Sequence, residues 1–322
     1  MNLMKLRMTM IGTVMLLIAV STLFFTIILS LVGVTNLLAL ALLVIMFNIV
    51  QWLLAPFMID ALYRVEEVSE TDSPRLHSIV GRLSQRLGLK MPRVMIANIP
   101  IPNAFAYGSP IAGSRVAVTR GLLKELEEEE VEAVLGHELG HLKNRDVQVM
   151  MFASVLPAIF YYIGYSMMAS SWYGGSRDRE GGSAAPALIG MVSMAIYWVL
   201  TLFVLGLSRL REYYADQRSV SIVEDGARKL SEALAKIVSS TSRMKRYGYA
   251  TPAINSFKAL FIEDPDSVER DQAAISSRVF KTDQQLVQEI LSRKVTLVDR
   301  ILELLSTHPN IVKRLQALQG LT

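Results

Sequence analysis

The sequence predicts a mainly α-helical membrane protein, with four transmembrane helices in two hairpins and an α+β domain on the cytoplasmic side. Composition is the first reason, because the 322-residue chain is 52% hydrophobic and only 19% charged, whereas an average soluble domain has about 25% charged residues. The second is that three long stretches contain no Asp, Glu, Lys or Arg. The third is that polar segments of domain size lie between and after these stretches.

The first charge-free stretch runs from Met8 to Ile59. A single helix of that length would be about 78 Å long, but a bilayer core needs only about 20 residues. We therefore expect two spans, Met8–Val32 and Leu37–Ile59, joined by a turn at Gly33–Asn36. A cleaved signal peptide is the alternative, but this apolar run is too long for one and a second span follows it directly.

Two further charge-free runs, 147–176 and 181–208, enclose a loop that is rich in Gly, Ser and charge. They predict a second hairpin with spans Gln148–Ala169 and Ala187–Leu207. A pair of buried core helices is the weaker alternative, because charge-free runs above about 18 residues favour a membrane span. Basic residues flank the spans at Lys5, Arg7, Lys143, Arg145, Arg209 and Arg211. This charge bias places both chain ends and residues 60–146 in the cytoplasm.

The expected organisation therefore alternates membrane and cytoplasmic segments. Each hairpin is followed by one half of the cytoplasmic domain. The four segments are a transmembrane hairpin at 1–59, the first half-domain at 60–146, a second hairpin at 147–208 and the second half-domain at 209–322.

The first half-domain combines helical and strand patterns. Apolar residues in Asp72–Leu89 recur at helical spacing, and Pro92–Pro100 and Ser114–Leu122 are short β-branched segments that predict strands. A helix is expected to start near Thr119 or Gly121. We interpret its early glutamate run, Glu127–Glu130, as a solvated face at the positive end of the helix dipole.

The stretch AVLGHELGHLKNRD contains His137, Glu138 and His141, and thus two of the four histidines in the chain. Residues four apart share one helix face, so both imidazoles can reach one zinc ion at about 2.0–2.1 Å. Glu138 can hold a water molecule and take its proton as general base, while zinc lowers the pKa of that water. The absence of cysteine excludes Cys-ligated metal and disulfides. Without a basic cluster interleaved with aromatics, nucleic acid is not an expected partner.

A catalytic zinc ion needs a third protein ligand and one open position. The second hairpin returns the chain to the side on which the histidines lie, and the first acidic residue after it is Glu212. Asp216 follows one helical turn later and is placed to accept the second N–H of a ligating histidine. His308 and Asp146 are the competing ligands, although Asp146 follows His141 too closely on one helix. An ion pair with a neighbouring arginine is the alternative role for Glu212.

At this point the chain resembles the HtpX-type membrane zinc metalloproteases, relatives of the CAAX prenyl proteases. The resemblance covers nearly the whole chain and rests on four motifs in the expected order, PNAFAYG at 102–108, HELGH at 137–141, EYYAD at 212–216 and STHPNIVKRLQAL at 306–318. It implies a zincin-like catalytic domain with one zinc ion. The implied ligands are His137, His141 and Glu212, with Glu138 as the base.

The resemblance also implies an edge strand along the substrate, formed by Asn103, Ala104, Phe105 and Ala106, which suits β-addition of an extended peptide. His308 either stabilises the oxyanion or caps a helix against Asp299 or a backbone carbonyl. The sequence departs from the family pattern in two places. Asn310 stands where a second proline is usual, and the segment from about 264 to 298 is longer than the usual link.

The function implied by the resemblance is zinc-dependent endoproteolysis of misfolded or damaged membrane proteins at the cytoplasmic face. The expected partners are protein substrates and the lipid bilayer. A CAAX-type processing protease is one alternative, although such enzymes usually have more spans. A non-catalytic zinc-binding membrane adaptor is another, but structural zinc sites are normally closed and four-coordinate. An intramembrane protease is rejected because charged residues flank the motif on both sides.

Overall fold

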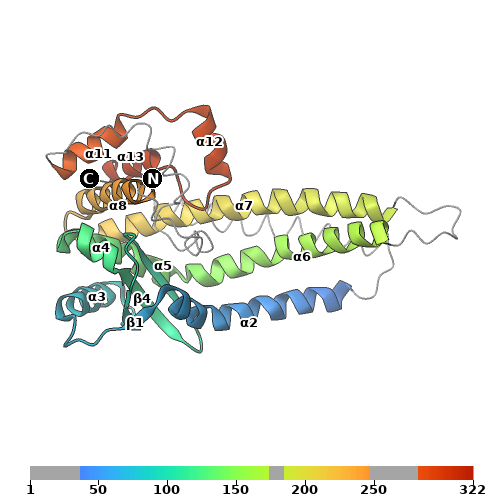
Figure 1. Ribbon diagram of the computed structural model, residues 1–322, viewed down its shortest axis with the longest axis horizontal. Coiled ribbons are helices and arrows are strands. Elements are labelled where there is room, and N and C mark those ends of the chain that lie inside the picture. Colours follow the sequence, from blue (N-terminus) through green and yellow to red (C-terminus); the bar gives the residue numbers. More distant parts are fainter. Residues whose placement is uncertain (1–36, 174–184, 247–281, 322) are drawn as a thin grey trace, which may run out of the picture. The chain divides into compact units, whose positions relative to one another are not determined.

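The computed structural model describes residues 37–173, 185–246 and 282–321. The predicted span Met8–Val32, the turn after it and residues 264–281 of the segment 264–298 lie outside these residues. The described chain is mostly helical and contains one small sheet (Figure 1). It divides into two compact units. The first unit contains Leu53–Val147 and Ser208–Thr322. The second contains Arg7–Trp52 and Gln148–Leu207.

Among the described residues, three long helices supply the second unit and each also extends into the first: α2 (Leu37–Tyr63), α6 (Asp146–Tyr173) and α7 (Ala185–Ile222). Among the described residues, two helices are long and apolar enough to cross a bilayer, Gln148–Met168 within α6 and α7 itself. They cover the positions predicted for the third and fourth spans. Within this unit α6 and α7 run side by side and bury Phe160 and Leu200 between them.

The first unit contains a four-stranded sheet in the order β1-β2-β4-β3. Its strands are β1 (Val65–Glu67), β2 (Arg93–Ala97), β3 (Ala104–Ser109) and β4 (Gly113–Thr119). The central pair β2 and β4 is parallel and both outer pairs are antiparallel. The two strands predicted from β-branched runs, β2 and β4, are confirmed. The strand β3 forms one edge of the sheet, next to β4.

Helices cover one face of the sheet and enclose the main apolar core of this unit. They are α3 (Pro74–Leu87), α5 (Glu128–Asn144), α8 (Gly226–Arg246), α11 (Asp283–Leu291) and α13 (Ile311–Gln319). As predicted, α3 ends at Gly88, whose φ of 61° suits glycine. On the opposite face of the sheet, Phe105 and Tyr107 of β3 pack with Tyr63.

The prediction of one continuous helix from residue 119 is wrong. The structure has a short helix α4 (Arg120–Glu125), an extended residue at Leu126 and then α5. Glu127 is the N-cap of α5 and forms a capping box with Glu130, so the glutamates begin a new helix rather than continue the old one. Glu130 is also buried and lies 2.8 Å from Lys236 of α8, so it does not belong to a solvated face. Burial raises its pKa.

The two helical pieces expected near the end of the sequence are confirmed as α12 (Leu297–Leu304) and α13, separated around His308 and Pro309. Asn310, the departure from the usual motif, is the N-cap of α13. Its side chain accepts a hydrogen bond from the amide of Val312 at 3.0 Å. Asparagine therefore stabilises the start of this helix, as N-cap residues do.

Gly121 allows the start of α4 to pass close to the loop before β3. A Cβ atom at this position would lie 2.0 Å from the carbonyl oxygen of Pro100. We expect Gly121→Ala to destabilise the protein by about 3 kcal/mol or more, because backbone must move. The control is Gly81→Ala within α3, where the nearest atom would be 3.7 Å away and alanine is favoured by about 0.5–1 kcal/mol. Thermal unfolding of both variants measures the difference; equal stabilities would contradict the prediction.

Candidate metal centre

The HELGH motif lies in the buried part of α5, which packs closely against α7. Two glycines of α5 permit this approach, since added Cβ atoms would lie 3.0 Å from Ser219 at Gly136 and 3.4 Å from Arg218 at Gly140. Ser219 also donates a hydrogen bond to the carbonyl of Ala133 at 2.6 Å. Gly136 and Gly140 therefore let α5 lie close to α7, the helix that also carries Glu212.

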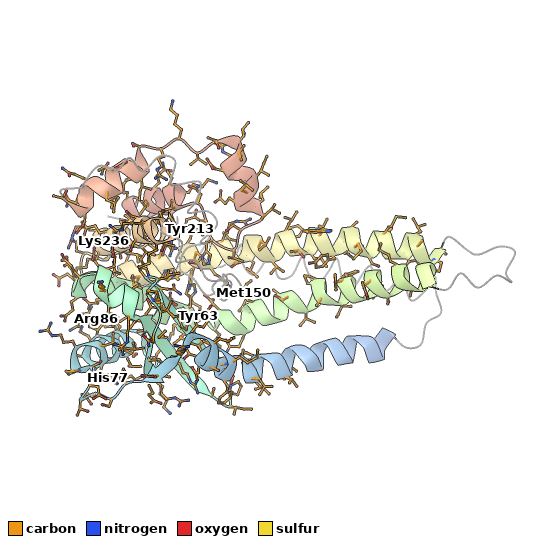
Figure 2. The ribbon with its side chains drawn as sticks, in the orientation of Figure 1. Tyr63, His77, Arg86, Met150, Tyr213 and Lys236 are labelled. Atoms are coloured by element: carbon orange, nitrogen blue, oxygen red, sulfur yellow. The ribbon has the colours of Figure 1, made fainter. Side chains whose placement is uncertain are left out.

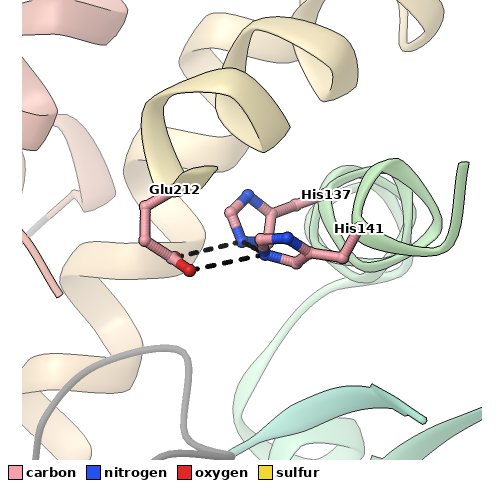
Figure 3. A group of neighbouring side chains, drawn as sticks. All are labelled: His137, His141 and Glu212. Carbon is pink, nitrogen blue, oxygen red and sulfur yellow. Dashed lines mark hydrogen bonds and ion pairs between the residues drawn. The ribbon is translucent and has the colours of Figure 1, made fainter. Parts of the chain in front are cut away.

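Three side chains converge between these helices, His137 and His141 from α5 and Glu212 from α7 (Figure 3). The two Nε2 atoms are 3.1 Å apart, and they lie 3.4 and 3.5 Å from the carboxylate oxygens of Glu212. Around a tetrahedral ion with bonds of about 2.0–2.1 Å, ligand atoms are about 3.3–3.4 Å apart. The donor atoms are thus already spaced as such an ion requires.

The other nitrogen of each imidazole faces a carboxylate. His137 Nδ1 lies 2.8 Å from Asp216, and His141 Nδ1 lies 2.6 Å from Asp146. A carboxylate accepts hydrogen bonds, so each Nδ1 is a donor, and in the neutral imidazole Nε2 is then the atom whose lone pair can bind a metal ion. Burial alone would lower the pKa of His137, but hydrogen bonds to Asp216 and Glu212 outweigh it and raise that pKa to about 9. The surroundings therefore favour positive charge at this point.

Asp146 has a role that sequence reasoning missed. The expectation that it continues the helix of His141 is wrong, because Arg145 ends α5 with a φ of 56° and Asp146 begins α6. This turn brings the Asp146 carboxylate back onto His141 Nδ1, on the side of the ring away from Nε2. Asp146 therefore contacts the imidazole and does not compete with Glu212. The sequence signal that could have predicted this contact is an acidic residue just after the end of the motif helix.

We predict that Asp146→Asn lowers metal affinity about 10–100-fold, the usual effect of losing the partner of a ligating histidine. The matched control is Asp225→Asn, an exposed residue with a φ of 54° that asparagine tolerates. Metal affinity of both variants is measured by competition with a chromogenic chelator. Equal affinities would show that Asp146 does not orient His141.

Arg314 of α13 was also missed, although it lies in a motif that the sequence displays. It is fully buried and contacts Asp216 with two nitrogens, at 2.7 and 2.8 Å. Burial would raise the pKa of Asp216, but the charge and hydrogen bonds of Arg314 outweigh it and lower that pKa. Arg314 also lies 3.6 Å from Glu212. It therefore keeps Asp216 ionised beside His137.

Glu138 is buried next to the histidines, and its Oε2 accepts a hydrogen bond from the amide of Ala106 at 2.9 Å. Burial raises the pKa of Glu138, against the opposing effect of the two histidines. The bond also ties the motif helix to the edge strand β3. Of the four residues predicted along a substrate, Ala106 is partly exposed, whereas Asn103, Ala104 and Phe105 are buried. The Phe105 ring belongs to the core, 5.6 Å from Tyr63.

His308 lies between α12 and α13, buried, with Nδ1 3.4 Å from Glu212. Asp299, one suggested partner of His308, instead accepts hydrogen bonds from Thr296 at the start of α12. Burial would raise the pKa of Glu212, but the charges of His308 and His141 outweigh it and lower that pKa well below its usual value. The remaining histidine, His77 on α3, lies apart from this group and contacts the carbonyl of Ser73 (Figure 2).

The arginines near Glu212 have other partners. Arg211 lies 3.3 Å from Asp146. Arg209 donates to the backbone carbonyls of Glu303, Leu304 and Ser306. The carboxylate of Glu212 instead lies within 3.6 Å of His137, His141 and His308 and of Arg314, which is distant in the sequence. Its position thus favours a ligand over a simple ion pair with its neighbours.

Comparison with known proteins decides the family. Residues 70–322 match the sequence model of peptidase family M48. The chain belongs to peptidase family M48. The Protease HtpX homolog of Thermoplasma acidophilum is 39% identical over 282 residues, which are 86% of this chain and 83% of the relative. The Protease HtpX homolog of Aeropyrum pernix is 37% identical over 283 residues, which are 88% and 85% of the two chains.

A solved structure also resembles this M48 peptidase. The crystal structure of S. mikatae Ste24p aligns with a TM-score of 0.56 at 15% identity, over 98% of this chain and 67% of that chain. At this identity the likeness shows the fold alone. The family and its HtpX relatives confirm the predicted resemblance and the predicted enzyme class, a membrane metalloprotease. The cluster of His137, His141 and Glu212 agrees with a metal ion.

Proposed function

We propose that this M48 peptidase is a multi-pass zinc endopeptidase in which His137, His141 and Glu212 hold one zinc ion per chain. The observation that carries the proposal is the convergence of three ligand side chains: the two imidazole Nε2 atoms are 3.1 Å apart, and each lies 3.4 or 3.5 Å from one oxygen of the Glu212 carboxylate. Two histidines and one glutamate are a known catalytic zinc set, which leaves a position open for substrate. A structural site would normally be closed by a fourth ligand.

Zinc supplies Lewis acidity, which polarises a peptide carbonyl and acidifies water. The protein's part in the reaction is proton transfer and orientation. Glu138 is the general base, which takes a proton from water and passes it to the leaving amine. Asp216 and Asp146 orient the two imidazoles, and Arg314 holds Asp216 in place. His308, which is buried with Nδ1 3.4 Å from Glu212, is proposed to donate to the oxyanion.

We propose that the substrate binds as an extended strand along β3. The amide of Thr119 donates to the carbonyl of Asn103 at 2.9 Å, so this pair is hydrogen-bonded across the ladder. By the alternation of antiparallel ladders, the backbone groups of Ala104, Ala106 and Gly108 then face away from β4. Added strands bind through edge groups of this kind; the amide of Ala106 donates to Glu138 in this structure. Asn103–Ala106 supply this edge beside Glu138, with Ala106 nearest to the reacting groups.

The proposed location is the cytoplasmic membrane, with four spans and the catalytic unit on the cytoplasmic side. The two candidate spans and the basic residues at the ends of the charge-free runs support this topology. The proposed substrates are misfolded or damaged membrane proteins. Their unfolded segments offer the extended backbone that an edge strand recognises, without a fixed sequence requirement.

Metal removal tests the proposal directly. The purified full chain is expected to contain about one zinc per molecule and to cleave an unfolded membrane-protein substrate or casein. A chelator should abolish cleavage, since the Lewis acid is lost, and stoichiometric zinc should restore it. Elemental analysis and gel-based cleavage are measured on the same preparation. Cleavage that survives complete removal of metal would overturn the proposal.

A further inference from the structure

The helix α12 presents an apolar face that the described part of the first unit does not cover. None of its residues is buried. Five large apolar residues in or directly after it are 54% to 76% exposed: Leu297, Val298, Ile301, Leu304 and Leu305. At 100° per residue they occupy an arc of about 120°, a single stripe. A contiguous exposed apolar patch on a folded protein often marks a surface that binds a membrane or another protein.

The opposite face of α12 is attached to the protein. Glu303 forms an ion pair with Lys313 of α13, and its carboxylate accepts a hydrogen bond from the amide of Asn310 at 3.2 Å. Asp299 belongs to the capping box at the start of the helix. These contacts direct the polar side of α12 toward α13, and the apolar stripe lies on the other side of the helix, where its residues are exposed.

Arg209 of α7 links that helix to the C-terminal end of α12. Its Nη1 donates to the carbonyls of Glu303 at 2.7 Å, Leu304 at 3.2 Å and Ser306 at 2.7 Å. These carbonyls lie at or just after the end of α12, where a helix leaves acceptors free for side-chain donors; the carbonyl of Glu303 also accepts the amide of Ser306 at 3.1 Å. Arg209 is also the first charged residue after the charge-free run that ends at Ser208 in α7. It stands where α7 would leave the hydrocarbon core.

We propose that α12 is a membrane-surface helix, whose apolar stripe inserts into the headgroup boundary of the bilayer that α7 crosses. Short amphipathic helices bind in this way, with the apolar face about 5–10 Å into the boundary. Lys294 and Arg300, both exposed beside the stripe, suit the phosphates of anionic lipids. The inference rests on the proposed membrane insertion and not on the catalytic mechanism.

This surface has a direct relation to the active centre. The chain leaves α12 through His308 and enters α13, which carries Arg314. A helix held at the membrane surface therefore anchors the segment that contacts Glu212 and Asp216.

The absence of cysteine permits a clean test, because a single introduced cysteine is unique. The full chain with Ile301→Cys, labelled with an environment-sensitive fluorophore, is reconstituted into phosphatidylcholine–phosphatidylglycerol vesicles. Nitroxide-labelled lipids and aqueous iodide serve as quenchers. Leu297→Cys is a second position on the stripe, and Gln288→Cys, exposed on α11, is the matched control. We expect blue-shifted emission and several-fold stronger lipid quenching at both stripe positions than at the control.

Iodide quenching at the stripe equal to the control, without lipid quenching, would show a solvated helix and overturn the proposal. A label shielded from both quenchers would overturn it as well, since another segment or a second copy then covers the stripe. Carbonate extraction of the same vesicles tests insertion of the chain separately. Zinc content and cleavage of the unlabelled variants report on the proposed function, so a catalytic failure is distinguishable from a failure of lipid contact.

Discussion

Glu138→Gln is expected to reduce peptide hydrolysis by about 10²–10⁴-fold, the usual contribution of a general base, while metal remains bound. Glutamine has nearly the same shape and keeps an oxygen that can accept the hydrogen bond from the Ala106 amide, whose nitrogen lies 2.9 Å from the Glu138 carboxylate. The local structure should therefore persist. An amide cannot take a proton from water at neutral pH, so only the chemical step is lost.

The measurement is kcat/KM on an unfolded substrate together with zinc content. Glu132→Gln is the matched control, since Glu132 lies on the same helix α5 but pairs with Arg82 at the surface. Surface ion pairs contribute little to stability, so this variant should cleave normally. Undiminished cleavage by Glu138→Gln would mean that another group is the base. Loss of zinc from that variant would assign Glu138 a ligand role instead.

Glu212→Ala is expected to lose metal more severely than Asp146→Asn, because it removes one of three proposed ligands rather than the partner of a ligand. The two imidazoles alone would leave the ion with half of a tetrahedral shell. Glu212→Gln is made in parallel, because it preserves the buried volume while its neutral amide is a poor ligand. Both variants should contain little zinc after dialysis and should lack cleavage.

Glu224→Ala, an exposed glutamate after α7, is the control. Thermal unfolding distinguishes loss of the ligand from loss of the fold, since Glu212 also lies beside the buried Arg314. Full zinc occupancy in a folded Glu212→Gln variant would place the third ligand elsewhere. His308, 3.4 Å away, would then be the first residue to substitute.

Local sequence signals predicted the elements that local physics determines. The apolar spacing of α3 and the glycine after it, and the β-branched runs of β2 and β4, each depend on neighbouring residues alone. The three converging side chains were also foreseen, because the HELGH spacing and the return of the chain after the charge-free runs constrain them. Their roles remain predictions until metal and activity are measured.

The features that the sequence did not predict depend on tertiary contacts or on the conformation of single residues. The separation of α4 from α5 depends on a capping box inside a run of glutamates, which looks like a solvated face when read alone. Asp146 contacts His141 only because Arg145 adopts a left-handed conformation. Arg314 contacts Asp216 from a helix 98 positions further along the chain. No local pattern distinguishes such a buried arginine from the surface arginines around it.

The contact between Arg314 and Asp216 determines at which stage of synthesis and folding this protease can become active. During synthesis the HELGH helix is made long before α13, and contacts between such distant segments form late in folding. Until then Asp216 lacks its buried cation and His137 lacks a fixed orientation. An incomplete chain is therefore expected to be latent. Dependence on a distant arginine would by itself delay peptide hydrolysis until the first unit has folded.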